Sequence, residues 1–397
     1  MMGVARSVEL ATLDIVGGRV RTGELAVTLP NGDTRTYRGR TRGPVVRVTL
    51  HDEKLLRRLA TLGAIGLADG YVSGDFDTND LARLIELAAL HLEQEHATHV
   101  PRPLARLGRS LWQTLGNAAA PRGPLPDTIS HYNIGNAFFA LWLDPTMTYS
   151  SAVFSHDDMT LEDAQREKYR RLAEATGLRT GDRVLEIGCG WGGFAVYATE
   201  ELGCHVTATT VSREQFDHVR KLVADRGLVD RIEPRLEDVR ATEGAFDHIV
   251  SIEMMESIPQ SLWAPYFRQL HDLTRPGGTI GLQVITVADR HWATSNTNPD
   301  FVRRYVFPGG QVPAPMVLRG LARRHGLRWI EDHGYGASYA RTLQTWGAAF
   351  EAHEQEIADM GFDEPFRRMW RYYLAYCEGG FRAGRVDVSQ IVLARAA

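Results

Sequence analysis

Short apolar runs alternate with amphipathic stretches over the second half of the chain. The amphipathic stretches have the 3.6-residue spacing of helices and cover 161–177, 194–202, 213–227 and 263–278. The segments between and after them have strand length, most of them apolar, and lie at 183–188, 205–211, 231–238, 246–254, 279–286 and 388–396. This order predicts an α/β fold with a doubly wound, mostly parallel Rossmann-like sheet and helical additions, with ligands at the carboxyl ends of its strands.

The pattern before residue 129 differs. Asn31 and Gly32 stand between two alternating segments and predict a β-hairpin. Helices are expected at 53–62 and 81–92, so residues 1–95 are interpreted as a small mixed α+β domain. Prolines mark 96–128 as a linker around a leucine-striped, arginine-flanked helix, which could lie on an anionic membrane or dock on its own protein. Residues 129–397 form the third predicted region, and its end adds helices at 341–360 and 364–377.

The composition limits the kinds of partner that the protein can bind. The 397 residues are 44% hydrophobic and carry a net charge of −4, so no basic field exists to bind nucleic acid. Three scattered cysteines support neither a disulfide framework nor a metal site. No export signal or apolar run of about 18 residues is found, and the expected location is the cytoplasm, with any membrane contact peripheral and on the inner face.

One apolar run leads directly into a glycine turn. The turn consists of Gly188, Cys189, Gly190, Trp191, Gly192 and Gly193. Glycines let the backbone turn with positive φ and let a ligand lie against it. Glu186 precedes the turn, and its carboxylate suits a cationic amino-acid moiety but would repel a pyrophosphate. The turn therefore favours S-adenosylmethionine over NAD.

Several separated segments together resemble the cyclopropane-fatty-acyl-phospholipid synthases, and look most like their plant-type and actinobacterial branch. The segments are His131–Phe154, Val184–Phe194, Thr210–Gln215, Phe246–Ile258, Arg304–Gly310 and Tyr372–Phe381. The resemblance covers nearly the whole chain. It implies methyl transfer from S-adenosylmethionine to the double bond of an unsaturated phospholipid acyl chain, with closure of a cyclopropane.

Three other functions stay open at this stage. Proton loss after a hydride shift would give a methylene branch, for which a separate reductase would be the partner. A small-amine N-methyltransferase and a regulator that binds the cofactor without catalysis share the fold. The sequence is also compatible with a homodimer.

The resemblance further implies a bound bicarbonate as the base. Glu256 and Tyr339 match the family's glutamate and tyrosine, and Ile285 matches the residue whose backbone helps to hold the anion. Ser151 stands where many members have cysteine, and Gln283 where many have histidine; both can still donate hydrogen bonds. Cys377 matches a nominated active cysteine, although a buried structural role is the stronger interpretation.

The resemblance assigns the cofactor's remaining contacts as well. Tyr149 and Ser150 match the pair that covers its amino-acid end. The second strand of the sheet ends without the usual acid, and Thr210 and Gln215 take that place. The adenine is expected beside the end of the third strand, at Glu237, Asp238, Val239 and, nearby, Ile252.

Overall fold

The computed structural model describes residues 12–97, 134–295 and 300–397. It divides the chain into two compact units. The described residues of the first unit come from 12–97, 300–304 and 351–383. Those of the second come from 134–295, 305–350 and 384–397.

A mixed four-stranded sheet of order β2-β1-β3-β4 forms one layer of the first unit. The predicted hairpin is confirmed: β1 (Thr22–Thr28) pairs antiparallel with β2 (Thr34–Arg38), and Gly32 in the turn has φ of +90°. β3 (Thr41–Leu50) lies parallel to β1, and β4 (Phe76–Thr78) is the far edge strand. Alternate residues of β3 are buried, which gives the sheet one covered face.

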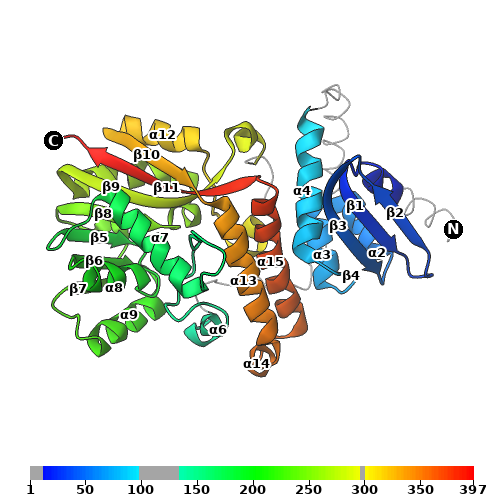
Figure 1. The fold of residues 1–397 in the computed structure, drawn as a ribbon, viewed down its shortest axis with the longest axis horizontal. Helices are drawn as coiled ribbons and strands as arrows, with labels where there is room; N and C mark the ends of the chain where they lie inside the picture. The colour runs from blue at the N-terminus through cyan, green and yellow to red at the C-terminus, as the bar shows by residue number, and fades with distance from the viewer. Residues whose placement is uncertain (1–11, 98–133, 296–299) are drawn as a thin grey trace. The chain divides into compact units, whose positions relative to one another are not determined.

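Helices complete the first unit (Figure 1). They are α2 (Lys54–Leu62), α3 (Ala64–Val72), α4 (Leu81–Ala97), α14 (Glu354–Asp359) and α15 (Glu364–Arg382). The sequence pattern did not reveal α3, because it holds two glycines that weaken helical propensity. One of them, Gly66, lets α3 approach α2 closely, since a Cβ there would lie 2.1 Å from the Arg58 carbonyl oxygen.

The domain division differs from the predicted one, in which 129–397 formed a single region. α15 packs against α3 and α4, so the segment 351–383 belongs with the N-terminal sheet. A Cβ at Gly379 would lie 2.6 Å from Ile85, which shows how closely the two helices approach. Arg368 adds a hydrogen bond to the Tyr71 carbonyl oxygen. The predicted linker helix lies outside the described residues.

The second unit is built on a seven-stranded sheet of order β10-β11-β9-β8-β5-β6-β7. Its strands are β5 (Arg183–Ile187), β6 (His205–Thr210), β7 (Ile232–Leu236), β8 (Phe246–Ile252), β9 (Thr274–Val287), β10 (Leu327–Gly334) and β11 (Val386–Arg395). The strands β5 to β9 pair in parallel, whereas β10 and β11 run antiparallel at one edge. The predicted mostly parallel, doubly wound α/β sheet is therefore confirmed.

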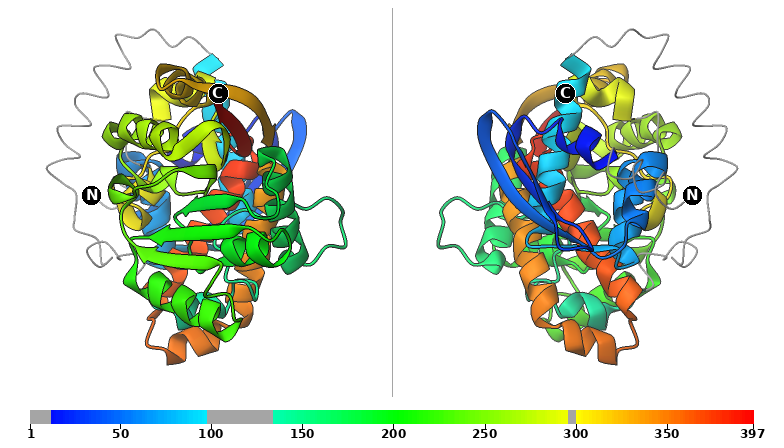
Figure 2. Two further views of the ribbon diagram at one scale, coloured as in Figure 1. Left: turned by 90° about the vertical axis from the view of Figure 1, so that its left-hand side faces the viewer. Right: turned by 90° about the vertical axis from the view of Figure 1, so that its right-hand side faces the viewer.

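Helices cover both faces of this sheet, as Figure 2 shows in its left view. One apolar cluster joins the sheet to α7 (Leu161–Thr176), α8 (Gly193–Glu200) and α9 (Arg213–Asp225). The other joins it to α10 (Trp263–Leu273) and α12 (Pro315–Arg324). Fully burying a large apolar side chain contributes about 1.5–3 kcal/mol to the free energy of folding. The two helical layers therefore hold the strand ends in place.

Three further helices belong to the second unit: α6 (Asn136–Ala140), α11 (Trp292–Ser295) and α13, which spans Gly336–Ala352 and ends at the unit boundary. The predicted helix at 341–360 is thus two helices, α13 and α14, and α12 and β10 were not predicted. Within the described ranges, no helix is both long and apolar enough to cross a membrane.

Candidate active site

The glycine turn connects β5 to α8 as the sequence predicted. Gly188, Gly190 and Gly192 have φ values of +76°, +54° and +89°, which side chains with a Cβ rarely adopt. The N–H groups of Gly188 and Cys189 both donate to the Thr209 carbonyl oxygen, at 3.0 and 2.9 Å. The turn is thereby fixed to β6 at the carboxyl edge of the sheet.

Glu186 and Gly190 fit the expected cofactor. The Glu186 side chain is 3% exposed, and its Oε2 is buried without a hydrogen-bond partner among the described residues. Burial raises the pKa of this carboxyl to about 8. At Gly190 an added Cβ would meet no atom within 4 Å, so the backbone borders open space. A buried acid in need of a donor, beside an uncovered glycine, suits a cationic ligand lying against the turn.

The segment around Tyr149 and Ser150 lies beside this turn. Tyr149 packs among three aromatic rings, at centroid distances of 5.3–5.5 Å. They belong to Phe139 of α6, Trp142 of the loop after α6 and Trp346 of α13. The ring of Trp191 packs against that of Phe139 in a tilted arrangement, with centroids 5.1 Å apart, and this contact joins the glycine turn to the same aromatic group. Cys189 is also buried, and burial raises the pKa of its thiol, which disfavours the thiolate that a nucleophilic cysteine needs.

The Ser150 hydroxyl accepts a hydrogen bond from a buried lysine that sequence reasoning missed. Lys168 of α7 is 0% exposed, and its Nζ donates to Ser150 Oγ at 2.7 Å. Burial lowers the pKa of the Lys168 ammonium to about 7, although the charges of Glu253, Asp144 and Glu186 oppose that change. A lysine among arginines and glutamates on an amphipathic helix gives no sequence signal of burial, which only the packing of α7 on the sheet creates.

Thr210 and Gln215, which are expected to contact the cofactor, form a hydrogen bond with each other. The Thr210 hydroxyl donates to Gln215 Oε1 at 2.7 Å, and the N–H of Glu237 donates to the Thr210 carbonyl oxygen at 3.0 Å. The ends of β6 and β7 are therefore adjacent. Val211, which the sequence analysis also missed, follows Thr210 and is 73% exposed, an apolar surface at the carboxyl edge of the sheet.

The other residues expected near the adenine have local roles. Asp238 accepts a hydrogen bond from the backbone N–H of Arg240 and pairs with its guanidinium at 2.7 Å, so its carboxylate caps a short 3₁₀ turn. Val239 and Ile252 are partly buried and pack against the two apolar clusters. Both residues contribute apolar surface at the strand ends. The Glu237 carboxylate accepts a hydrogen bond from the Thr242 hydroxyl.

The residues expected to hold an anion converge on a carboxylate that the sequence analysis did not single out. Glu253 directly follows β8, and its Oε1 accepts hydrogen bonds from the Ser151 N–H and from Gln283 Nε2, both at 2.8 Å. Its Oε2 accepts from the Tyr339 hydroxyl at 2.7 Å. Ser151, Gln283 and Tyr339 therefore share one acceptor, the side chain of Glu253.

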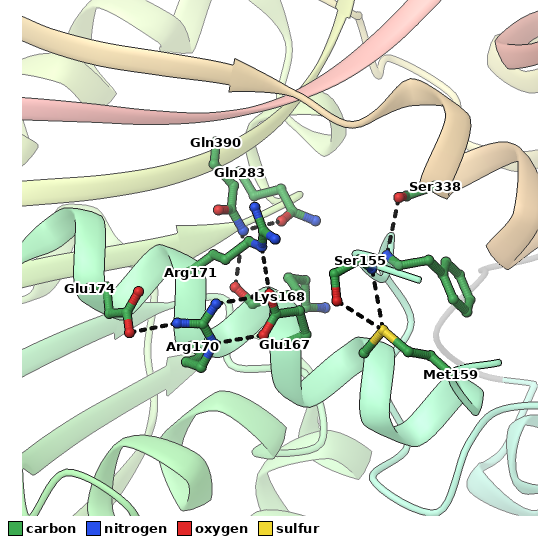
Figure 3. Close-up of polar contacts among 11 residues, drawn as sticks. Ser155, Met159, Glu167, Lys168, Arg170, Arg171, Glu174, Gln283, Ser338 and Gln390 are labelled. Carbon is green, nitrogen blue, oxygen red and sulfur yellow. Dashed lines mark hydrogen bonds and ion pairs between the residues drawn. The ribbon is translucent and has the colours of Figure 1, made fainter. Parts of the chain in front are cut away.

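Gln283 is held in a fixed orientation by a second glutamine (Figure 3). Gln390 of β11 donates through its Nε2 to Gln283 Oε1 at 3.1 Å and to the Lys168 carbonyl oxygen at 3.0 Å. The Gln283 amide nitrogen must then face its two acceptors, the Ser151 carbonyl oxygen at 3.1 Å and Glu253. Gln283 is 1% exposed, so this orientation is set by protein groups.

Glu256 and Ile285 form a separate contact. Glu256 lies in a 3₁₀ turn after β8, and its Oε1 accepts from the Ile285 N–H. Its Oε2 is buried without a hydrogen-bond partner in the described structure. Burial, and after it the nearby charge of Glu253, raises the pKa of Glu256 to about 8, so this carboxyl is largely neutral at pH 7.

Cys377 lies in α15, in the first unit, whereas Glu253 and Glu256 lie in the second. Burial raises the pKa of the Cys377 thiol, with a smaller contribution from Asp300. A nucleophilic cysteine needs a thiolate, which this environment disfavours. In the described ranges, no group of three or more His, Cys, Asp or Glu residues could hold a metal ion.

The fold and the site define an S-adenosylmethionine-dependent methyltransferase. The sheet is Rossmann-like, a glycine turn with an unpartnered acid lies at its carboxyl edge, and hydrogen-bond donors converge on a buried carboxylate in the same unit. The family described as mycolic acid cyclopropane synthetase matches residues 123–391. The chain belongs to this family, whose members modify lipids.

Named relatives agree with this assignment. The chain is 35% identical over 355 residues to the tuberculostearic acid methyltransferase UfaA1 of Mycobacterium tuberculosis, a match that covers 86% of this chain and 82% of the relative. It is 31% identical over 350 residues to the cyclopropane-fatty-acyl-phospholipid synthase of Escherichia coli, covering 88% and 87%. The crystal structure of the mycolic acid cyclopropane synthase CmaA1 with SAH and CTAB matches with a TM-score of 0.63 and 31% identity, over 67% of this chain and 96% of that one.

Proposed function

We propose that this enzyme methylates a carbon–carbon double bond in an unsaturated acyl chain of a phospholipid. One observation carries the proposal. The consecutive residues Ser150 and Ser151 connect the glycine turn, where the cofactor is expected, to the acid cluster, which consists of Glu253 and Glu256. Ser150 accepts from buried Lys168 beside the glycine turn, and the next N–H, that of Ser151, donates to Glu253. A methyl donor held at the turn would thus lie close to carboxylates able to take a proton.

The chemistry needs such an arrangement. S-adenosylmethionine supplies an electrophilic methyl group, which a weak nucleophile such as an isolated alkene requires. Addition of the methyl group leaves a carbocation on the acyl chain, and this must lose a proton before water captures it. The chain contributes buried carboxylates and a shell of aromatic and amide side chains that limits the access of water.

Two products follow from where the proton is lost. Loss from the new methyl group closes a cyclopropane, the product that the sequence resemblance implied and that the name of the Escherichia coli relative states. Loss of that proton after a hydride shift leaves a methylene branch. The second product is favoured by the 35% identity to a tuberculostearic acid methyltransferase across most of both chains, and a reductase would then complete the branch.

The phospholipid carrier rests on the sequence resemblance and on the name of the Escherichia coli relative. An enzyme with this substrate would work at a membrane surface, and we propose the cytoplasmic face. The leucine-striped helix expected within the linker 96–128, for which docking on its own protein is the alternative, is a candidate contact, and it lies outside the described residues.

Expression in a host rich in monounsaturated phospholipids tests the proposal. Mass spectrometry of the fatty-acid methyl esters should show a gain of one CH₂ that an empty-vector control lacks. An upfield cyclopropane resonance in the proton NMR spectrum identifies ring closure, and vinylidene protons identify the methylene branch. Unchanged lipids, from protein shown to be folded and to bind S-adenosylmethionine by calorimetry, would contradict the proposed function.

A further inference from the structure

Glu253 has a backbone conformation that a glutamate rarely adopts. Its φ is +50°, and Met147 is the other non-glycine residue with positive φ in the described part of the chain. Such a conformation costs roughly 1–2 kcal/mol for a residue with a Cβ. Such a conformation persists only where contacts with the surrounding structure fix the residue in it, and residues of this kind occur most often at functional sites.

The contacts that fix Glu253 come from three distant segments. Its own N–H donates to the Gln283 carbonyl oxygen at 2.8 Å, which anchors the backbone to β9. The carboxylate then receives the three donors described above, from the loop before α7, from β9 and from α13. Each oxygen has at least one donor, so the side chain is held in one position.

These donors are the ones from which a bicarbonate site was expected. Ser151, Gln283 and Tyr339 all face the Glu253 carboxylate, and the Ile285 N–H faces Glu256. The Ser151 hydroxyl donates to the Ala152 carbonyl oxygen instead. A carboxylate has the same planar O–C–O group as bicarbonate, so the donors that would hold the free anion are already engaged. A second anion placed beside Glu253 would also be repelled by it.

We propose that the carboxylate of Glu253 is the base of the reaction and takes the place of an exogenous bicarbonate. The proposal rests on the proposed function. After the alkene has accepted the methyl group, a C–H bond of that new methyl group breaks, and its proton forms an O–H bond to Glu253. The C–H electron pair forms the ring bond to the cationic carbon or, when a hydride shift has first moved the cation to the carbon that bears the methyl group, the methylene double bond. Glu253 ends neutral and returns its proton to water between turnovers.

The electrostatic surroundings suit a base. Burial raises the pKa of Glu253 above that of an exposed glutamate, which makes its carboxylate a better proton acceptor. The hydrogen bonds from Tyr339 and Gln283 and the charge of Lys168 act in the opposite direction and favour the ionised form. Glu256, with its pKa raised to about 8, is largely neutral at pH 7.

Replacement by glutamine removes the basicity and keeps the shape. We expect Glu253→Gln to lose about 100-fold or more in turnover, because a positioned base typically contributes 10²–10⁴-fold. Binding of S-adenosylmethionine, measured by calorimetry, should stay within about threefold of wild type, a difference of less than 1 kcal/mol. The exposed Glu243→Gln is the matched control and should keep full turnover. A turnover of Glu253→Gln close to that of wild type would overturn the proposal.

Replacement by glycine makes a sharper test. Glycine accepts φ of +50° without strain, and Glu253→Gly leaves the Ser151, Gln283 and Tyr339 donors facing a space of carboxylate size. Added bicarbonate or formate should raise the turnover of this variant about tenfold or more, a fraction of the 10²–10⁴ that a base supplies. Binding of ¹³C-bicarbonate to Glu253→Gly without the cofactor, followed by NMR line broadening, gives a readout independent of activity.

Wild type should keep its activity in buffer freed of carbon dioxide. A wild-type enzyme that loses activity there and regains it with bicarbonate would overturn the assignment of Glu253 while leaving the proposed function intact. A wild-type enzyme that leaves unsaturated lipids unchanged under both conditions would instead contradict the proposed function. The two failures are therefore distinguishable.

Discussion

The ammonium group of Lys168 donates a hydrogen bond to the hydroxyl of Ser150 at 2.7 Å, in a position that solvent does not reach. Lys168 also lies close enough to Glu186 and Glu253 to change the pKa of both. One buried cation is thus shared between the cofactor side of the site and the acid cluster.

Lys168 should make stability depend on pH. Its pKa falls from 10.5 when exposed to about 7 when buried, so between these values the folded state binds fewer protons than the unfolded state. This contribution is present above pH 10.5 and is lost as the pH falls through about 7. The unfolding free energy of wild type, relative to Lys168→Met, should therefore rise across this window by up to about 1.4 kcal/mol per pH unit.

Urea unfolding between pH 6 and pH 10 measures this difference. Lys221→Met removes an exposed lysine paired with Asp225 and is the control, for which the difference from wild type should not vary with pH. Parallel curves for wild type and Lys168→Met would show that Lys168 keeps an ordinary pKa in the folded protein.

Cofactor affinity should increase with pH. Glu186 has a pKa raised to about 8, so the stability that it contributes is present below its unfolded pKa and is lost as the pH rises through about 8. A cationic ligand favours the ionised form, and its affinity should rise up to about tenfold per pH unit from pH 6 to about 8 and then level off. Lys168 loses its charge in the same window and acts in the same direction.

Calorimetric titration with S-adenosylmethionine at several pH values checks this. Glu186→Gln should bind more weakly and show a smaller slope, whereas the exposed Glu243→Gln should keep the wild-type slope. An affinity that does not change with pH would contradict the role given to Glu186.

Gly190→Ala should separate stability from cofactor binding. Its φ is +54° and nothing lies within 4 Å of an added Cβ, so the folded protein loses only the cost of the strained backbone, about 1–2 kcal/mol. The methyl group would project from the turn against which the cofactor is proposed to lie. Affinity should fall at least about tenfold, which is 1.4 kcal/mol.

Gly181→Ala is the matched control for this change. Gly181 has φ of +86° and equally open surroundings, but it precedes β5 and lies at the opposite end of the strand from the turn. We expect a similar loss of stability in urea unfolding and unchanged cofactor affinity. Equal affinities for the two variants would place the cofactor away from Gly190.

Tyr339→Phe should change the pH profile of turnover. The Tyr339 hydroxyl donates to Glu253 Oε2 and favours its ionised form, so its removal raises the pKa of Glu253 further. The acid limb of the kcat profile should move to higher pH, so that on this limb kcat falls by up to about tenfold for each pH unit of the shift. Tyr335→Phe, on the loop before α13, should leave the profile unchanged. An unshifted acid limb would mean that Glu253 is not the titrating base.

Cys377→Ala should keep turnover within about threefold of wild type, since desolvation disfavours its thiolate and the proposed reaction needs no thiol. The same assay of lipid methylation measures it, together with a melting curve to exclude unfolding. A large loss of turnover in a stable variant would restore the catalytic role that the sequence resemblance suggested for this cysteine.

The central parallel strands β5, β8 and β9 were predictable because they are largely buried and therefore appear as mainly apolar runs. β10 was missed for the opposite reason: it is an edge strand, most of whose residues after Trp329 are exposed, and its sequence is polar. α3 was missed because its glycines lower helical propensity, while their benefit, close packing on α2, comes from tertiary contact. The assignment of 351–383 to the N-terminal unit likewise depends on packing between α15 and α4.

The sequence alone determined the glycine turn, the acid before it and the order of the parallel strands and of the helices between them. All of these rest on local backbone preferences and on side-chain periodicity, which a linear chain displays directly. The tertiary structure decided which acid receives the donors at the candidate base site. Glu253 is separated by 102 positions from Ser151, by 86 from Tyr339 and by 30 from Gln283. Hydrogen bonds over such separations depend on how loops, strands and helices pack, so among the two glutamates of the Glu253–Glu256 segment only the folded chain distinguishes the carboxylate that the donors hold.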